Sequence, residues 1–485
     1  MTQRSDRIRL IERFVALACF LILVVPLVVY CAWKVPLGQV PDEPNHIARV
    51  DSVLRGEVIG YRLKTPNPST GAPNAGVTGN YGLIYAAAAG NGANAPLPAS
   101  ASAQQRLAWA KAIPWSPAPG FLSSVNTAAY APIAYIPAAL ALGVGISRGD
   151  GPHDAALAAR FGNVIAFTIL GCLALLLAGR GRLLLLVTLG LPITIWLAGS
   201  CNQDGVLIAV AVLALALLTR QDRAGFWGGT ILLAVLALQK PPFLTLMLLP
   251  LVLPTAMRGT WAKRISAALA IMIPAVLWSL LVMWHVSVPL LPSAIYHPGP
   301  LWAGDPALVF HSAIPAAQIS VLLHHPLTVA LLPLADKIPT ITTPFADLIG
   351  ILGSYDIRLP SRLYALFSFA LLSAAAALLT SAPVMSHRSI AAKCWAWALV
   401  LIAALSCAEL IYLVEYLTWT PVGFNRIDGI QGRYFVPLLP ILALLLGRVL
   451  PIPARFGWIW WILPLVALIA LDAQLPGIIT QYYYR

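Results

Sequence analysis

The sequence predicts an all-α polytopic membrane protein with about eleven transmembrane helices, within a range of roughly 10–13. Two features of the composition predict this fold class. Hydrophobic residues make up 59% of the 485 positions and charged residues only 10%, against roughly 25% charged residues in soluble domains. The apolar residues also recur in long runs, several of them near the length of a helix that crosses the hydrocarbon core. We therefore expect a single transmembrane domain over residues 1–485.

The apolar runs give the expected spans in order. The first run, Phe14–Trp33, carries no charge and has no small-residue cleavage site after it, which predicts an uncleaved membrane anchor. Further runs lie near 156–178, 183–199, 205–219, 224–238, 243–256, 265–285, 361–381, 394–417, 435–450 and 457–474. Because several of them are shorter than 20 residues, we expect their boundaries to shift by several positions.

Basic residues predict the orientation of these spans. They gather in six hydrophilic breaks, accompanied only by Asp6, Glu12 and Asp222: Arg4/Arg7/Arg9/Arg13, Arg180/Arg182, Arg220/Arg223, Arg258/Lys263/Arg264, Arg388/Lys393 and Arg448/Arg455. An excess of Lys and Arg marks cytoplasmic segments. We therefore expect the amino terminus inside and the carboxyl terminus outside. The net charge of +13 is then explained by the basic residues of the cytoplasmic segments, and we expect no nucleic-acid partner.

Two long segments are expected on the outer face. The first, residues 34–155, contains an expected amphipathic helix over 44–55, which Pro44 begins and Gly56 ends. The spacing of Ile47, Val50 and Leu54 predicts that one face lies on the membrane, with Arg49, Asp51 and Arg55 facing water.

An apolar run over 130–146 follows in the same segment, but Pro132 and Pro137 interrupt it, and a crossing there would turn every later basic cluster outward. We therefore expect it to be a helix in the membrane interface. The second outer segment, residues 286–360, holds an apolar stretch near 319–334 that could be re-entrant.

The pair Asp42-Glu43 is the leading candidate for chemistry. It stands between Pro41 and Pro44, directly outside the first span, with His46 close by. A carboxylate at this face can accept a proton from an incoming hydroxyl or amine, and a second one can orient the acceptor or hold a divalent metal. The alternative is that both acids only cap the helix that follows.

Asp204 is a second candidate acid, in a polar turn on the same expected face. It could complete a Mg²⁺ or Mn²⁺ site with Asp42 and Glu43, although no metal is required by the sequence. The alternative is that Asp204 caps the helix that it begins.

Cations and aromatic residues at the outer ends of spans are candidates to bind a substrate. An arginine there can grip a phosphate with paired hydrogen bonds, although a cation that extends to the membrane surface is the alternative. Aromatic rings suit stacking against sugars but equally suit an interfacial belt. The expected substrate-binding residues are His46, Arg49, Tyr130, Arg160, Asp204, Lys240, Arg426, Gln431, Arg433 and Tyr434.

Seven short motifs carry a family resemblance when taken in order. They are Asp42-Glu43-Pro44-x-His46, Asn126-Thr127-Ala128-Ala129-Tyr130-Ala131-Pro132, Ala159-Arg160-Phe161-x-Asn163, Leu191-Pro192-Ile193-Thr194, Asp204-Gly205, Lys240-Pro241-Pro242 and Gln431-Gly432-Arg433-Tyr434-Phe435-Val436-Pro437. Over about residues 12–475, the chain resembles the bacterial membrane proteins grouped as domain of unknown function 2142. That family in turn looks like a branch of the C-type (GT-C) glycosyltransferases.

The resemblance implies a function and a place in the cell. It implies a bacterial inner-membrane enzyme with its active site on the periplasmic face. The expected donor is a polyprenyl-phosphate sugar, and the expected acceptor is a glycan, a lipid or a protein of the cell envelope. Asp42 matches the catalytic acid of the relatives, and Asp204 matches the acid after their third span. Arg433 is the expected phosphate ligand, together with Arg426 or Lys240.

Two other functions fit the same composition. A polysaccharide polymerase or ligase is also a multi-span protein with a long outer loop. For such an enzyme we would expect an essential Arg or His in place of an essential acid. A lipid or solute transporter predicts internal repeats and charges near mid-membrane. We find no such repeat, and only Glu409 lies that deep in an expected span.

The orientation is testable with a reporter fused after Arg182. We expect the reporter to be cytoplasmic, because this placement puts all six basic clusters on one side of the membrane. A phosphatase reporter that is active in the periplasm at this position, with a fluorescent reporter as the converse control, would contradict the predicted topology.

Overall fold

The computed structural model describes residues 2–64, 73–90, 101–253, 261–288, 314–337, 342–380, 389–447 and 456–484. Helix accounts for 74% of the chain, which confirms the predicted helical class. Within these ranges, six helices are long and apolar enough to cross a membrane, or up to eight if two bent pairs each count as one span. Parts of the outer segment 286–360, and Arg258, Arg388, Arg448 and Arg455 of the basic clusters, lie outside the described residues.

The first predicted span is one long helical segment. It runs through α1 (Thr2–Cys19), the π-helical turn η1 (Phe20–Val24) and α2 (Val25–Lys34). The other long apolar helices are α7 (Pro152–Leu177), α13 (Trp261–His285), α17 (Ser361–Leu379), α18 (Ile390–Thr418) and α20 (Ile459–Tyr483). Each of them matches a run that the sequence predicts as a span.

The remaining predicted spans are short or broken. The run 183–199 divides into α8 (Arg182–Leu189) and α9 (Pro192–Ala198), and α9 meets α10 (Gln203–Leu218) at an angle of 118°. After α11 (Arg223–Gln239), the run 243–256 becomes η3 (Pro241–Met247) and α12 (Leu248–Val252). The run 435–450 becomes η5 (Gly432–Ile441) and α19 (Leu442–Leu445). Pro192 begins α9, and prolines also begin or interrupt η3 and η5, where each removes a backbone donor and clashes with the preceding turn. The bend before α10 falls at residues 199–202, which contain no proline.

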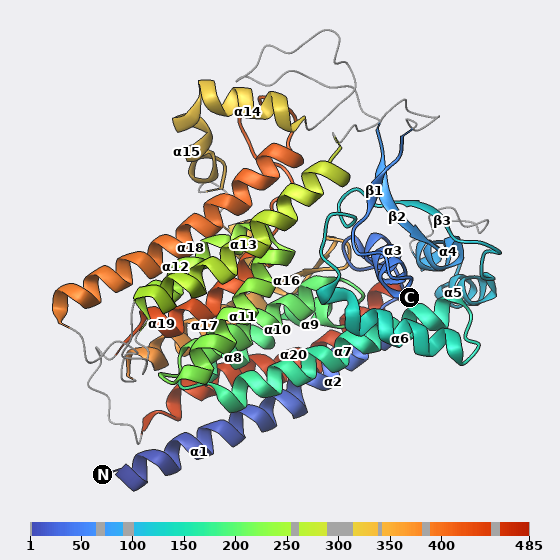
Figure 1. Ribbon diagram of the computed structural model, residues 1–485. Coiled ribbons are helices and arrows are strands. Elements are labelled where there is room, and N and C mark those ends of the chain that lie inside the picture. The colour runs from blue at the N-terminus through green and yellow to red at the C-terminus, as the bar shows by residue number, and fades with distance from the viewer. Residues whose placement is uncertain are drawn as a thin grey trace.

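The first outer segment forms a small layer at one end of the helices (Figure 1). It contains a three-stranded antiparallel sheet in the order β1-β2-β3, formed by β1 (Tyr61–Arg62), β2 (Ala75–Gly79) and β3 (Gly120–Ser123). In its register Gly76 pairs with Tyr61 on one side and with Ser123 on the other. Helices α4 (Tyr81–Gly90) and α5 (Ala103–Ala112) complete the layer. This sheet corrects the all-α prediction, which included no strand.

Helix α3 (Glu43–Leu54) confirms the predicted helix 44–55 to within one residue. Its predicted orientation is wrong, because Arg49 and Asp51 are fully buried where they were expected to face water. The Arg49 guanidinium donates to the carbonyl oxygen of Tyr130, and Asp51 Oδ2 accepts from the backbone N–H of Asn80 at 2.6 Å. Protein groups take the place of water around both charges, so the helix is enclosed by α4, β2 and α6.

The predicted interfacial helix 130–146 corresponds to η2 (Ile133–Tyr135) and α6 (Ile136–Ser147). At 12 residues, α6 is about 18 Å long, too short to cross a hydrocarbon core of about 30 Å. It packs along α7 (Figure 1). Its position in the membrane interface stays a prediction.

The second outer segment includes α14 (Pro315–His324) and α15 (Pro326–Lys337), which meet at an angle of 100° over the predicted re-entrant stretch. The side chain of Gln318 anchors α14 to the end of α18, since Nε2 donates to the carbonyls of Tyr416 and Thr420. Next come α16 (Thr342–Gly350) and a hairpin of β4 (Ile351–Leu352) and β5 (Ile357–Arg358).

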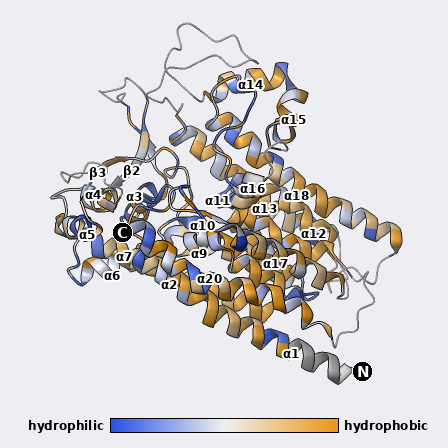
Figure 2. Cartoon of the chain, turned by 180° about the vertical axis from the view of Figure 1, so that it is seen from behind, coloured by the Kyte–Doolittle hydropathy of each residue, from blue (hydrophilic) through white to orange (hydrophobic). Residues whose placement is uncertain are grey.

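The hydrophilic break that carries Arg180 and Arg182 packs against the segments around Leu378 and Leu446. Glu12 and Arg182 line one pocket there, and Arg180 donates to the carbonyls of Leu378 and Leu446 at 3.0 and 2.7 Å. The chain termini lie at opposite ends of the molecule in both views (Figures 1 and 2), and hydrophobic residues dominate the helices between them (Figure 2).

Candidate functional site

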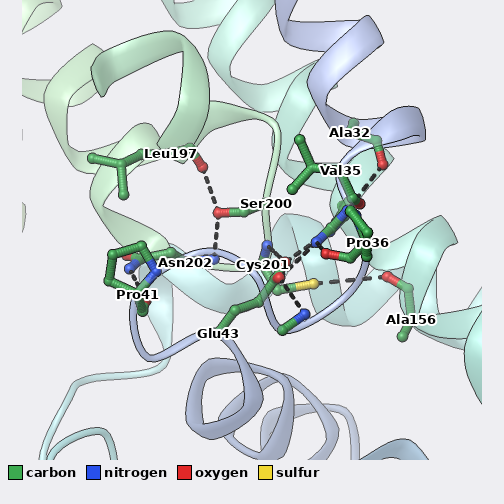
Figure 3. A network of polar contacts seen from close by, with 12 residues as sticks. Ala32, Val35, Pro36, Pro41, Glu43, Ala156, Leu197, Ser200, Cys201 and Asn202 are labelled. Carbon is green, nitrogen blue, oxygen red and sulfur yellow. Dashed lines mark hydrogen bonds and ion pairs between the residues drawn. The ribbon is translucent and has the colours of Figure 1, made fainter. Parts of the chain in front are cut away.

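An ion pair between Glu43 and Arg160 lies in the interior, with both side chains fully buried. Arg160 Nε donates to Glu43 Oε1 at 2.7 Å, and Nη2 donates to Oε2 at 2.6 Å. The same two oxygens accept backbone N–H groups, from Cys201 at 3.0 Å and from Gly38 at 2.8 Å. Figure 3 shows Glu43 enclosed in this network. All of the roughly four acceptor positions of the carboxylate are therefore occupied.

The guanidinium of Arg160 is equally saturated. Besides Glu43, it donates to the carbonyls of Ala32, Val35 and Pro36, at the end of α2 and in the loop that follows. Its planar fork of five N–H groups is thus fully used. Because removal of one partner leaves an uncompensated buried charge, breaking a pair of this kind costs about 3–5 kcal/mol. Glu43 and Arg160 therefore hold the fold together at this point.

The ion pair brings separate segments of the chain to one place. Glu43 begins α3, Arg160 lies on α7, and Cys201 lies in the turn between α9 and α10. A second bond joins the same loops, because Asn202 Nδ2 donates to the carbonyl of Pro41 at 3.0 Å (Figure 3). Asp42 is consequently held against the start of α10, where Asp204 lies.

Asp42 stands at the N-cap position of α3 in the left-handed conformation, with φ 61°. This conformation is uncommon for residues other than glycine, although Asp tolerates it. The Asp42 side chain makes no capping hydrogen bond, so the capping alternative is wrong for this residue. Its carboxylate is 39% exposed. Oδ1 accepts from Asn126 Nδ2 and Oδ2 from Arg433 Nη2, each at 3.1 Å.

Arg433 joins the two acids of the site. Its Nη2 contacts Asp42, and its Nε lies 3.5 Å from Asp204 Oδ2. Asp42, Asp204 and Arg433 therefore lie together, although 391 positions separate the first residue from the last. The guanidinium is only 2% exposed. Its Nε and Nη1 make no hydrogen bond to the described residues.

Lys240 is the second cation of the cluster. Its Nζ lies 2.6 Å from Asp204 Oδ1 and 4.7 Å above the ring of Tyr434. Asp204 does not cap α10, because the side chain of Asn202 accepts the backbone N–H of Asp204 and so serves as the cap. The capping alternative for Asp204 is therefore wrong, and its carboxylate is directed at Lys240 and Arg433.

A small pocket adjoins these charges. Its polar lining is Asp204, Lys240, Arg433 and Tyr434, and its apolar lining is Leu207, Ile208, Phe243 and Pro437. A pocket with cations at one side and hydrocarbon at the other suits an anionic head group that carries an apolar chain.

His46 and Tyr130 support the site from α3 and from the segment before η2. Their rings are parallel, with centroids 6.2 Å apart, and His46 Nδ1 contacts the Tyr135 hydroxyl at 2.8 Å. Burial lowers the pKa of His46 to about 4, although nearby Asp42 and Asp204 act in the opposite direction. Burial also raises the pKa of the Tyr130 hydroxyl well above its usual range, and Asp204 adds to this effect. Both side chains are therefore neutral at pH 7.

Other predicted site residues lie elsewhere or act differently. Arg426 pairs with Asp428 at 3.3 Å, is 61% exposed and makes no contact with the charged cluster among the described residues. The side chains of Arg49 and Arg160 form hydrogen bonds to other groups of the protein, so they are not free to bind a substrate. Gln431 directly precedes η5, and its Oε1 is buried without a hydrogen-bond partner among the described residues.

The expected metal set of Asp42, Glu43 and Asp204 is not assembled. The acceptor positions of Glu43 are already filled, and Asp204 faces two cations. In the part of the chain that the structure describes, no group of three or more His, Cys, Asp or Glu side chains is arranged to hold a metal ion.

Sequence reasoning missed several residues beside the cluster. The ring of Tyr355 lies 5.8 Å from the Arg433 guanidinium, and Tyr355 is the other described non-glycine residue with a positive φ. Asp347 accepts the backbone N–H of Gly432. The charges of Lys240 and Arg433 also act on Glu415, near the end of α18. No local sequence pattern marks these three residues, because tertiary packing alone brings them to the site.

Fold and site together define a helical membrane protein with a charged cluster that joins its outer-layer segment to several helices. The family model described as "Predicted membrane protein (DUF2142)" matches residues 17–442. The chain therefore belongs to the DUF2142 family, as its motifs indicate. No curated protein matches the chain. No solved structure matches it either.

The role of the buried ion pair can be tested with Arg160→Met. We expect a loss of about 3–5 kcal/mol in stability, because Glu43 then stays buried without its partner. Arg148→Met is the matched control, since Arg148 forms an exposed pair with Asp150 at 2.7 Å and its loss should cost less than about 1 kcal/mol. Thermal unfolding in detergent measures both variants. Equal, small shifts would show that the pair does not hold the fold together.

Proposed function

We propose that this protein is a membrane glycosyltransferase that moves a sugar from a polyprenyl-phosphate donor to an acceptor of the cell envelope. The observation that carries the proposal is the buried contact of Arg433 with Asp42 through Nη2 and with Asp204 through Nε, while Nη1 has no hydrogen-bond partner among the described residues. A base next to a phosphate-binding cation is the arrangement that this reaction needs.

In the proposed reaction, a hydroxyl of the acceptor attacks the anomeric carbon of the donor sugar. Asp42 accepts the hydroxyl proton as the new carbon–oxygen bond forms. The bond between the anomeric carbon and the phosphate oxygen breaks, and its electron pair leaves with the polyprenyl phosphate. Attack from the face opposite the leaving group inverts the configuration. Asp42 suits the role of base because its carboxylate is partly exposed, whereas that of Asp204 is only 8% exposed.

Arg433 and Lys240 would hold the phosphate and stabilise the charge that it gains on leaving. Arg433 Nη1, which has no hydrogen-bond partner among the described residues, can donate to a phosphate oxygen while Nη2 stays on Asp42. Asp204 orients both cations, through contacts of 2.6 and 3.5 Å. Glu43 acts at a distance from the reaction, because its bonds fix the backbone that carries Asp42.

The lipid part of the donor fits the apolar wall of the pocket. Leu207, Ile208 and Phe243 line it beside the cations, so a phosphate on Arg433 leaves its isoprenoid chain next to hydrocarbon. This match supports a lipid-linked donor over a nucleotide sugar. The acceptor class, whether glycan, lipid or protein, stays open.

The orientation and fold belong to the same proposal. With about eleven crossings, a cytoplasmic amino terminus and a GT-C-like architecture, the site opens to the periplasm from the inner membrane. Arg180 contacts the carbonyls of Leu378 and Leu446, which lie near the expected cytoplasmic ends of their spans, and this supports the orientation. The short helices α10 and α11 would then complete their crossings together with the broken segments beside them.

The catalytic assignment is testable with Asp42→Asn. We expect transfer to fall by at least about 100-fold, the lower end for loss of a general base, with membrane insertion and thermal stability unchanged. Asparagine keeps the size of aspartate and tolerates the left-handed conformation, but it accepts no proton. The measurement is sugar transfer from undecaprenyl-phosphate sugars by the purified protein.

Asp150→Asn is the matched control, because Asp150 forms an exposed ion pair with Arg148. This variant should transfer sugar like the wild type. Wild-type turnover by Asp42→Asn protein would remove Asp42 from the catalytic role, whichever sugar the enzyme uses.

A further inference from the structure

A second group of polar atoms near Arg433 has no part in the reaction above. Asp347 Oδ1, the Tyr355 hydroxyl and Gln431 Oε1 are buried without a hydrogen-bond partner among the described residues. Buried polar atoms in proteins are nearly always paired. Several unpaired atoms around one guanidinium therefore point to a ligand that supplies the missing bonds.

Asp347 and Tyr355 approach Arg433 from α16 and from the β4–β5 turn, and Gln431 stands two residues before Arg433, at the start of η5. Asp347 lies on α16 and holds the start of η5, because its Oδ2 accepts the backbone N–H of Gly432. A side chain at Gly432 would collide with α16, since a Cβ there would lie 2.3 Å from the backbone nitrogen of Leu348. Tyr355 comes from the turn between β4 and β5, and its ring lies 5.8 Å from the Arg433 guanidinium.

The chemistry of the group specifies the ligand. A carboxylate oxygen and an amide oxygen accept hydrogen bonds, and a phenol can donate or accept. Hydroxyl groups on neighbouring carbons meet these needs, because each can donate to one protein oxygen and accept from another group. A ligand with its own carboxylate is disfavoured, since it would approach Asp347 with like charge.

We propose that Asp347, Tyr355 and Gln431 form the subsite for the donor sugar, and that it takes an uncharged, hydroxyl-rich sugar in preference to a uronic acid. This inference rests on the proposed transfer reaction, in which Arg433 binds the phosphate next to the sugar. It assigns the selection of the sugar to α16 and to the β4–β5 turn, neither of which contributes to catalysis.

The β4–β5 turn controls access to the subsite. Asp347 and Arg433 are only 7% and 3% exposed, whereas Tyr355 is half-buried. A sugar therefore reaches these atoms when the ring of Tyr355 moves. Tyr355 and Gly353 both have positive φ angles, 74° and 66°. The left-handed conformation strains a tyrosine, so displacement of the turn releases part of that strain.

The test compares lipids that differ only in the sugar. Binding of full-length protein in detergent is measured with undecaprenyl phosphate and with its glucose, mannose and galactose esters. It is then measured with the uronic acid of whichever sugar binds best. The wild type should bind that neutral ester at least about 10-fold more tightly than the bare phosphate or the uronic ester, which corresponds to about 1.4 kcal/mol.

Two variants locate the effect. Tyr355→Phe should reduce the gain from the neutral sugar by about 5-fold, roughly the loss of one hydrogen bond. Asp347→Asn should restore binding of the uronic ester, because asparagine removes the repelling charge and still accepts from Gly432. Both variants should bind bare undecaprenyl phosphate like the wild type, which shows that they are folded.

Three results would overturn the inference. If the variants keep the wild-type preference for the neutral sugar, the subsite lies elsewhere. If the wild type binds undecaprenyl phosphate as tightly as every sugar ester, the protein binds the phosphate but does not recognise the sugar at this subsite. The proposed reaction is not contradicted by that result. If the wild type binds none of the lipids, the proposed reaction fails, and the subsite fails with it.

Discussion

The buried ion pair of Glu43 with Arg160 is the constraint on which the rest of the site depends. A charge in a hydrophobic interior is stable only when it is paired and fully hydrogen-bonded, and here every donor and acceptor of the pair is used. The bonds lead from α7 to the end of α2, to the start of α3 and to the turn before α10. If those segments separated, a buried charge would lose its partner, so their relative positions are fixed.

The candidate site follows from this constraint. Asp42 precedes Glu43 in the chain, and Asp204 follows the anchored turn, so fixing the pair also fixes the distance between the two acids. Arg433 then enters from η5 and bridges them. The two neighbouring acids differ in their surroundings. Glu43 is buried and holds the fold together, whereas Asp42 has a left-handed backbone conformation and a partly exposed carboxylate. Such strain is common where a side chain must be aimed at a substrate.

Much of this arrangement could be predicted from the sequence, and the exceptions have physical reasons. Asp42 and Arg433 stood out because charges at the ends of apolar runs are rare in a chain of this composition. The orientation of Arg49 could not be predicted, because a helical pattern does not tell whether protein or water surrounds the polar face. The strands were missed because they are two to five residues long. Prolines such as Pro192 shortened the expected spans, and Asp347 meets the site only through packing.

We propose, as the central claim, that Arg433, placed beside Asp42 through the Glu43–Arg160 pair, receives the phosphate of a lipid donor. The most direct measurement is an electron cryomicroscopy structure of the full chain with undecaprenyl phosphate bound. We expect the phosphate within hydrogen-bond distance of Arg433 Nη1 and the isoprenoid chain along Leu207 and Phe243. Density for the phosphate at another end of the bundle, or Arg433 directed away from Asp42, would contradict the claim.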